Sequence, residues 1–343
     1  MADELDPLVE APPANTQSPV RRWLVHGVKA LIGVALVAYL LNAYDAAEVG
    51  RGIAGANLWD ILLACVWGAL SLYCFALMYR VSMRKLDMPI TALSIMKIQL
   101  QIRFYALFMP GSANLFVKWY KFAKPGKQPA QALLVMAFTR VLLTVSMLAL
   151  ALVGVMGDAL FPWDELRLYL LVGLLLSLAC FFMLTSKRIA ALFEPILQWP
   201  WPGASYAAPL RKRVAKLLTI SKGFQTFSKS QIIALLALSI LGSVFQSLQL
   251  LALAHAVGLP IGLLTMLWLR GVSQMVAMIP ISISGLGLRE ASMVAILIGY
   301  GVSEPEALSF SLLIFAVVIV GKGLVGGVLE AWEQFGTPRK EAT

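Results

Sequence analysis

Long apolar runs separated by short polar stretches make up most of this chain of 343 residues. Six runs are close to the length of roughly 20 residues that an α-helix needs to cross a bilayer. The pattern therefore predicts six membrane-spanning helices. They are expected at about 23–44, 58–79, 131–156, 167–186, 231–254 and 306–329.

Two further apolar segments are interrupted by proline and glycine. The segment 97–118 is broken at Pro110-Gly111 and has basic residues at both ends, and the segment 262–302 is broken at Pro280. Broken backbone is tolerated at membrane depth only where it is buried in protein or lines a wet cavity. We predict two re-entrant hairpins that enter from opposite sides. The second segment is also long enough for two full spans.

The predicted fold class is an all-α polytopic membrane protein with six to eight transmembrane helices, two broken hairpins and a possible inverted repeat. Arg103 and Lys118 lie on either side of Pro110, and Arg270 and Arg289 lie on either side of Pro280. In transporters built from inverted repeats, opposed broken helices meet at a binding site near the bilayer midplane.

The composition excludes a soluble globular protein. Of the residues, 59% are hydrophobic and 13% are charged, whereas a soluble domain has about a quarter of its residues charged. The net charge of +10 indicates membrane orientation and contact with anionic lipid rather than nucleic-acid binding. Because basic residues follow the second and fourth predicted spans, we predict that both termini are cytoplasmic in a bacterial-type inner membrane.

Three parts are expected along the chain. Residues 1–20 are acidic and proline-rich and resemble a disordered tail. Residues 21–332 form the integral membrane domain, and 333–343 form a C-terminal tail. Within the membrane domain, 187–230 is predicted to be a cytoplasmic loop with a basic amphipathic helix, which suits either an anionic lipid surface or the underside of the protein itself.

Ionisable residues inside the predicted membrane segments are mostly basic. Each such residue costs about 2.5–3.5 kcal/mol on insertion scales, and an excess of buried cations favours an anionic ligand. Phosphate is the natural candidate, because arginine offers it a planar fork of donors. Alternatively, these arginines bond backbone carbonyls that the two breaks leave free. The candidate lipid- or anion-binding residues are Arg103, Pro110, Lys118, Arg140, Arg270, Pro280, Ser282, Ser284, Gly285, Gly287, Arg289, Glu290 and Lys322.

A helix is predicted to restart near Gly287, after the break at Pro280. Its free N–H groups would face the cavity, with Arg289 and Glu290 in its first turn. Ser282 and Ser284 would donate hydrogen bonds to the ligand. Glu290 would orient Arg289 or contact a cationic headgroup amine. The alternative is a loop between two spans, with the charged pair at a solvated helix start.

The same stretch carries a resemblance to a known family. PISISGLGLRE, residues 280–290, resembles the P-x-S-x-x-G-x-G-x-R-E signature of the lysylphosphatidylglycerol synthase transmembrane-domain family, whose members are flippase-like membrane proteins. The family's earlier signature, P-G-R-A-G-[DE]-x-x-R, is similar to PGSANLFVK at 110–118. There, Ser112, Asn114 and Leu115 depart from the pattern, and Lys118 replaces an arginine.

The resemblance implies a lipid translocase that moves an anionic or aminoacylated phospholipid, or a polyprenyl-linked lipid, between leaflets. Membrane lipids would be its partners, together with a possible separate lipid-modifying enzyme. We expect no aminoacyl-transfer domain, because the chain ends soon after its last predicted span. Paired carboxylates and metal-ligand spacings are not visible, so no enzymatic activity, metal or cofactor is expected. The alternatives are a small organic-anion transporter and a non-catalytic accessory subunit of a lipid or glycan synthase.

Overall fold

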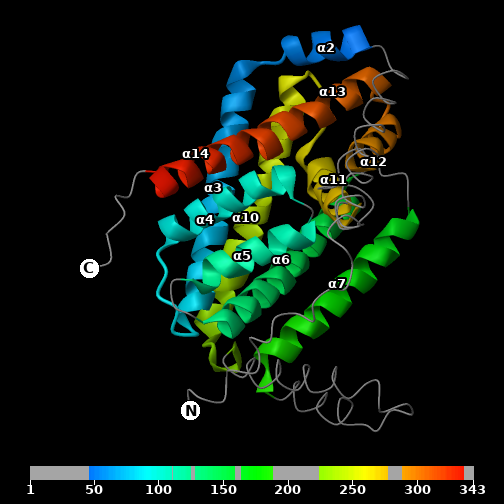
Figure 1. Cartoon of the computed structure of the whole chain (residues 1–343). Coiled ribbons are helices and arrows are strands. Elements are labelled where there is room, and N and C mark those ends of the chain that lie inside the picture. Colours follow the sequence, from blue (N-terminus) through cyan, green and yellow to red (C-terminus); the bar gives the residue numbers. More distant parts are fainter. Residues whose placement is uncertain are drawn as a thin grey trace, which may run out of the picture.

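The computed structural model describes residues 46–109, 111–124, 128–158, 164–187, 224–276 and 288–335. Within these ranges the secondary structure is helical and contains no strand. The elements, shown in Figure 1, are α2 (Ala46–Ala54), α3 (Leu58–Arg84), α4 (Ala92–Phe108), α5 (Gly111–Ala123), α6 (Pro129–Gly157), α7 (Asp164–Thr185), η2 (Phe224–Thr226), α10 (Lys229–Ala256), α11 (Leu263–Val276), α12 (Leu288–Ile298), α13 (Glu304–Ile314), η4 (Phe315–Gly321) and α14 (Lys322–Phe335).

Five helical segments among the described residues are long and apolar enough to cross a membrane. Each matches a predicted span, which confirms an all-α multi-pass membrane protein. The first predicted span, the tail at 1–20 and most of the predicted loop at 187–230 lie outside the described residues. The five segments are Leu58–Arg84, Pro129–Gly157, Glu165–Thr185, Lys229–Ala256 and Glu304–Glu333.

Helices α3 and α10 form an antiparallel pair in the middle of the bundle (Figure 1). The start of α3 meets the end of α10, where Asn57 N–H donates to the carbonyl oxygen of Ala256 at 2.8 Å. Further along, the hydroxyl of Ser71 donates to the carbonyl oxygen of Gly242 at 2.8 Å. Helices α4, α6, α11 and α13 pack against one or both members of this pair, whereas α7 packs against α6.

Two pairs of short helices occupy the predicted hairpins. In the first, α4 ends at Phe108 and α5 begins at Gly111, so the helix is interrupted in the region of the predicted break. The pair extends over 92–123, beyond the predicted limits of 97–118. In the second, α11 and α12 flank 277–287, which lie outside the described residues. With 17, 13, 14 and 11 residues, none of the four reaches the roughly 20 residues of a full span.

Glycines allow α4 and α14 to pack closely. A Cβ added at Gly326 would overlap the carbonyl oxygen of Leu100, one at Gly323 would meet the Leu107 side chain, and one at Gly327 would lie 2.8 Å from the ring of Phe104. Small residues let helix backbones approach each other in membranes.

The same packing joins α6 to α11 on the other side of the central pair. A Cβ at Gly154 would meet the carbonyl oxygen of Leu264, and one at Gly271 would lie 2.9 Å from Cβ of Ala151. As a result, the first helix of each hairpin is held by a glycine contact against a long helix from the other half of the chain.

These contacts reveal an inverted repeat. The order α3, α4, α5, α6 corresponds to α10, α11, α12 and the last span, α13–η4–α14. Contacts of α3 with α4, α4 with α5 and α5 with α6 recur as α10 with α11, α11 with α12 and α12 with α13. The contact of α4 with α14 recurs as that of α11 with α6. Because α3 and α10 are antiparallel, the two halves run in opposite directions.

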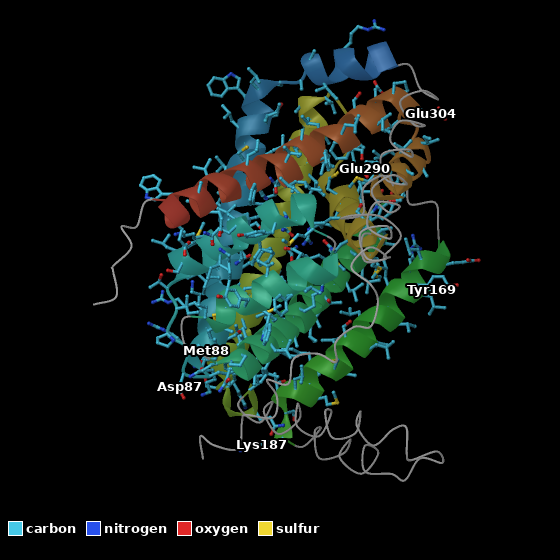
Figure 2. All side chains as sticks on the ribbon, in the orientation of Figure 1. Asp87, Met88, Tyr169, Lys187, Glu290 and Glu304 are labelled. Carbon is cyan, nitrogen blue, oxygen red and sulfur yellow. The ribbon has the colours of Figure 1, made fainter. Side chains whose placement is uncertain are left out.

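The two ends of the bundle differ in the charged residues that gather there. Lys187 and Asp87 lie at one end and Glu304 at the other (Figure 2). The first end also holds the last turn of α3 with Arg84 and the first turn of α10 with Lys229. The second end holds Asp158 at the end of α6.

Candidate functional site

Three cationic side chains from different helices converge on α10 and its surroundings. Arg103 is on α4, Arg270 is on α11, and Lys322 begins α14 directly after the π-helical segment η4. All three side chains are partly buried among the described residues. A π-helical segment inside a span is frequently found at a functional site, and here it sets the position of Lys322.

Lys322 is held by a neutral acceptor. Its Nζ donates to Oε1 of Gln249 on α10 at 3.0 Å. Gln249 is only 2% exposed, and its amide group lies in a notch against Gly68 of α3. Arg103 is close enough for its charge to act on Lys322. Arg103 and Lys322 are therefore two cations within electrostatic range of each other.

Arg270 is held in the same way. Its guanidinium donates to Oε1 of Gln246, one helical turn before Gln249 on α10. Residues three apart on a helix lie on neighbouring positions of one face. Both hairpins thus contribute an arginine to the surroundings of α10, and α10 offers amide oxygens rather than carboxylates.

None of the three cations forms an ion pair with a described residue; the ion pairs found join Lys97 to Glu333 and Lys121 to Glu330. Charge taken out of water without a counter-ion is costly, and the cost falls when an ion of opposite charge arrives. The arrangement is suited to receiving an anionic group, and arginine forks match phosphate oxygens in geometry.

The predicted helix restart is confirmed, because α12 begins at Leu288. Glu290 in its first turn is fully buried, at 0% exposure. The structure describes the backbone of Arg289 but not its side chain. Five predicted site residues in the break, like Pro110 in the first hairpin, lie outside the described residues. They are Pro280, Ser282, Ser284, Gly285 and Gly287.

Lys118 points from α5 towards α3. Its Nζ donates to the hydroxyl of Tyr79 at 2.7 Å and lies 4.9 Å from the centre of that ring. This contact combines a charge-assisted hydrogen bond with a cation–π interaction. In the described structure Lys118 therefore ties the first hairpin to the central pair, rather than joining the cations around α10.

Arg140 is not among the cations around α10, and it is not covered by other described residues. Its side chain is exposed on α6, about twelve residues from the start of a 29-residue helix. The sequence shows depth along a span but not the direction in which a side chain points. An exposed guanidinium at this depth faces either lipid or a water-filled groove, and both are accessible to a lipid phosphate.

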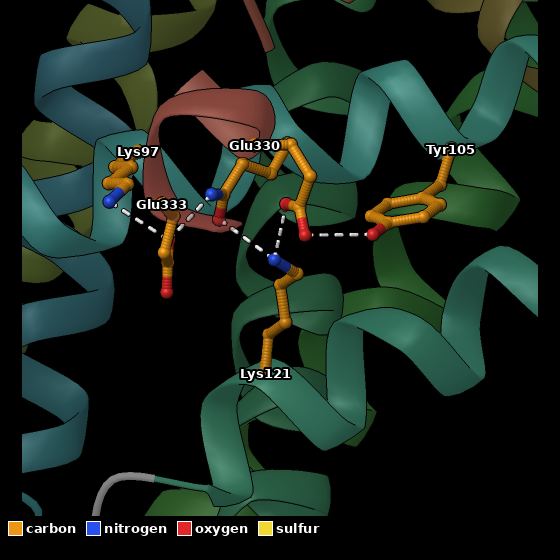
Figure 3. Close-up of polar contacts among 6 residues, drawn as sticks. Lys97, Tyr105, Lys121, Glu330 and Glu333 are labelled. Carbon is orange, nitrogen blue, oxygen red and sulfur yellow. Dashed lines mark hydrogen bonds and ion pairs between the residues drawn. The ribbon is translucent and has the colours of Figure 1, made fainter. Parts of the chain in front are cut away.

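A polar cluster on α4, α5 and α14 was not predicted (Figure 3). Lys121 Nζ lies 2.6 Å from a carboxylate oxygen of Glu330, whose other oxygen accepts from the hydroxyl of Tyr105 at 2.8 Å. Gln101 donates to Glu333 at 2.8 Å. We call these residues, with Lys97, the Glu330 cluster. The acids follow the last predicted span, so the sequence alone placed them at its end and not in contact with α4 and α5.

A second cluster lies around Asp158. One of its carboxylate oxygens accepts from the Thr265 hydroxyl at 2.8 Å, the Trp268 indole at 3.3 Å and the Tyr300 hydroxyl at 2.7 Å. Burial raises the pKa of the Tyr300 hydroxyl, and the hydrogen bond to Asp158 raises it further. We call these four residues the Asp158 cluster.

The two clusters lie at opposite ends of the bundle. Trp119, two residues before Lys121, donates to the carbonyl oxygen of Pro129 at the start of α6, whereas Asp158 follows the end of that helix. With 29 residues, α6 is about 43 Å long at 1.5 Å per residue.

The clusters also occupy equivalent places in the inverted repeat. Each joins the first helix of a hairpin to a carboxylate at the end of the fourth element of the other repeat. Gln101 in the Glu330 cluster lies two residues before Arg103, and Trp268 in the Asp158 cluster lies two residues before Arg270. On a helix, positions two apart point in different directions. Each hairpin helix therefore presents one face to a cluster and another to the centre.

A comparison with protein families matches the model described as the lysylphosphatidylglycerol synthase TM region over residues 28–326. The chain belongs to this family. No curated protein matches the sequence. The match covers both hairpins, the central pair and all three converging cations, and it confirms the resemblance to this family. It identifies a membrane protein related to lipid handling. No group of three or more His, Cys, Asp or Glu that could hold a metal occurs among the described residues.

Proposed function

We propose that this protein translocates lipids between the leaflets of a bacterial inner membrane, with both termini in the cytoplasm. Its cargo would be an anionic or aminoacylated phospholipid, or a polyprenyl-linked lipid. The observation that supports this most is the convergence of Arg103, Arg270 and Lys322 without a carboxylate partner among the described residues. The two hairpins supply one arginine each, so a headgroup between them would contact both repeats.

The orientation rests on the charges at the two ends of the bundle. The end that holds Arg84, Lys187 and Lys229 would face the cytoplasm, because short cytoplasmic loops are enriched in Lys and Arg. The Glu330 cluster would then lie towards the cytoplasm and the Asp158 cluster towards the outside. Each would restrict access to the site from its own side, and opening them in turn would give alternating access.

Arg140 has a different role in this proposal. Because its side chain is exposed on α6, it would meet a lipid phosphate at the protein surface before the headgroup moves inwards. The acyl chains would stay in the bilayer. This role uses the exposure that the structure shows and does not require Arg140 to touch the other three cations.

The proposal can be tested with purified protein in liposomes that contain phosphatidylglycerol with a fluorescent acyl chain. A membrane-impermeant reductant quenches only the label in the outer leaflet, so translocation appears as additional quenching. We expect Arg103→Gln, Arg270→Gln and Lys322→Gln each to slow it by about tenfold or more, as loss of a charge-assisted phosphate contact implies. Arg84→Gln, at the exposed end of α3, is the matched control and should leave the rate unchanged.

Wild-type rates in all three folded variants would contradict the proposal. If the protein moves no lipid but takes up glycerol phosphate, and the same variants block uptake, the small organic-anion transporter is correct. If neither substrate moves, the accessory-subunit alternative is favoured.

A further inference from the structure

Two glutamines occupy the places where a membrane protein usually has acids. Buried cations in membrane segments commonly pair with carboxylates. Here, Gln249 accepts from Lys322 at 3.0 Å, and Gln246 accepts from Arg270. A glutamate has the same length and would reach the same cations. The amide provides the hydrogen bond and orients the cation, but it does not cancel the charge.

The amide nitrogen of Gln249 is still available to donate a hydrogen bond. This nitrogen, Nε2, is buried and has no hydrogen-bond partner in the described part of the chain. A buried donor without a partner is destabilising, and an anionic oxygen beside Lys322 would remove that cost. A glutamate carboxylate would offer no such donor. The oxygen of Gln249 thus holds the lysine while its nitrogen remains available to a ligand.

We propose that Gln246 and Gln249 are positioning residues that set the charge selectivity of the site in favour of a headgroup with net negative charge. This inference rests on the proposed function and narrows it. A phosphodiester with net charge −1, as in phosphatidylglycerol, gains from every unneutralised cation. A zwitterionic headgroup gains less, because its amine is repelled. A lysyl-esterified headgroup, with net positive charge, is disfavoured.

The geometry explains why the selectivity resides on α10. Gln246 contacts a cation from the second hairpin, and Gln249 contacts one from the last span, which packs on the first hairpin. One helix face therefore holds cations next to both hairpins. Changing both glutamines to acids would add two negative charges to the site without changing side-chain length.

The inference can be tested by native mass spectrometry of the purified protein with equimolar phosphatidylglycerol, phosphatidylethanolamine and lysylphosphatidylglycerol. We expect the wild type to retain phosphatidylglycerol most and lysylphosphatidylglycerol least. The double variant Gln246→Glu/Gln249→Glu should lose phosphatidylglycerol by about tenfold or more and gain the cationic lipid, because nearby charges act strongly at low dielectric.

Two controls separate charge from packing. Gln249→Leu removes the oriented acceptor but adds no charge, so it should weaken binding of all three lipids and preserve their order. Gln231→Glu places the same substitution on α10 at its first turn, where Gln231 forms a capping box with Ser228. Glutamate serves equally well in that motif, so the lipid preference should not change.

The outcomes distinguish this inference from the proposed function. If phosphatidylglycerol retention is unaffected by Arg270→Gln, the cation site itself is wrongly assigned. If Arg270→Gln abolishes retention but the double Gln→Glu variant keeps the wild-type order, the cation site stands and the inference about the glutamines fails. Preferential retention of lysylphosphatidylglycerol by the wild type would also overturn it.

Discussion

Gly326 lies directly against the carbonyl oxygen of Leu100, so that α14 and α4 touch through their backbones. Gly323 and Gly327 make the neighbouring contacts with side chains of α4. This contact joins the two repeats, because α4 belongs to the first repeat and α14 ends the second. It also brings Glu330 to Lys121 and fixes where Lys322 enters the bundle.

Gly326→Ala should destabilise the protein by about 1–3 kcal/mol, the usual cost of overpacking. The added methyl group would overlap backbone atoms, which cannot rotate away as a side chain can. Thermal unfolding followed by tryptophan fluorescence in detergent measures the effect. Gly173→Ala on α7 is the matched control, because its Cβ would lie at an ordinary 3.5 Å from Leu148. Equal melting temperatures for the two variants would contradict the close contact.

The two ion pairs between the first hairpin and α14 should differ in strength. In the Lys121–Glu330 pair the side chains are 16% and 12% exposed, whereas in Lys97–Glu333 they are 40% and 47% exposed. Lys121→Gln should cost about 3–5 kcal/mol, because it leaves a buried carboxylate without its charge partner.

Lys97→Gln should cost about 1 kcal/mol or less, as exposed pairs do. Melting temperatures of both variants at low and high salt provide the comparison. The Lys97→Gln difference should shrink at high salt because exposed charges are screened. The double variant Lys121→Gln/Glu330→Gln should recover part of the lost stability. A larger loss for Lys97→Gln than for Lys121→Gln would refute this ranking.

The hydrophobic pattern was sufficient to predict most of the architecture. Five predicted spans are present, and α4 ends and α5 begins close to the predicted break. Gly323 and Gly327 have the small-residue spacing that favours close helix packing, and both lie against α4. These features are local: length, a missing backbone donor and small residues at helical spacing are all visible along the chain.

Features that depend on the partner helix were not predictable. Glu330 is part-buried and pairs with Lys121, which is 209 positions away, so the sequence alone offered no reason to place it in a contact. The outward direction of the Arg140 side chain likewise depends on which face of α6 packs inwards. Gln246 and Gln249 were missed because uncharged side chains in a span do not stand out until the structure shows the cations that they hold.

Tyr300 should make the folding stability of the protein depend on pH in the alkaline range. Burial and the Asp158 carboxylate raise the pKa of its hydroxyl in the folded protein. A tyrosine is neutral when protonated, so the folded state holds this proton more tightly than the unfolded chain. The resulting stabilisation is fully present below the unfolded pKa of about 10 and is lost as pH rises through the higher folded value.

Melting temperatures of the wild type and Tyr300→Phe between pH 8 and 11, a range spanning about one to two units either side of the tyrosine pKa, test this expectation. The amount by which the melting temperature of the wild type exceeds that of Tyr300→Phe should be constant below about pH 10 and decrease above it. Asp158→Asn should make the decrease smaller, because removing the negative charge next to the hydroxyl brings its folded pKa closer to the unfolded value. A wild-type advantage that grows above pH 10 would show that the sign is wrong.

Gly68→Ala should impair lipid binding more than it affects folding. The added methyl group would meet the amide of Gln249, the flexible end of a side chain, which can move aside at low cost. That movement, however, separates Oε1 of Gln249 from Lys322, whose hydrogen bond is 3.0 Å long. We expect phosphatidylglycerol retention to fall several-fold at a nearly unchanged melting temperature, whereas Gly173→Ala, again the control, should change neither. If Gly68→Ala retained phosphatidylglycerol as well as the wild type does, Lys322 would not need Gln249 to bind the anion. If the variant instead had a much lower melting temperature, the contact between Gly68 and Gln249 would serve packing only.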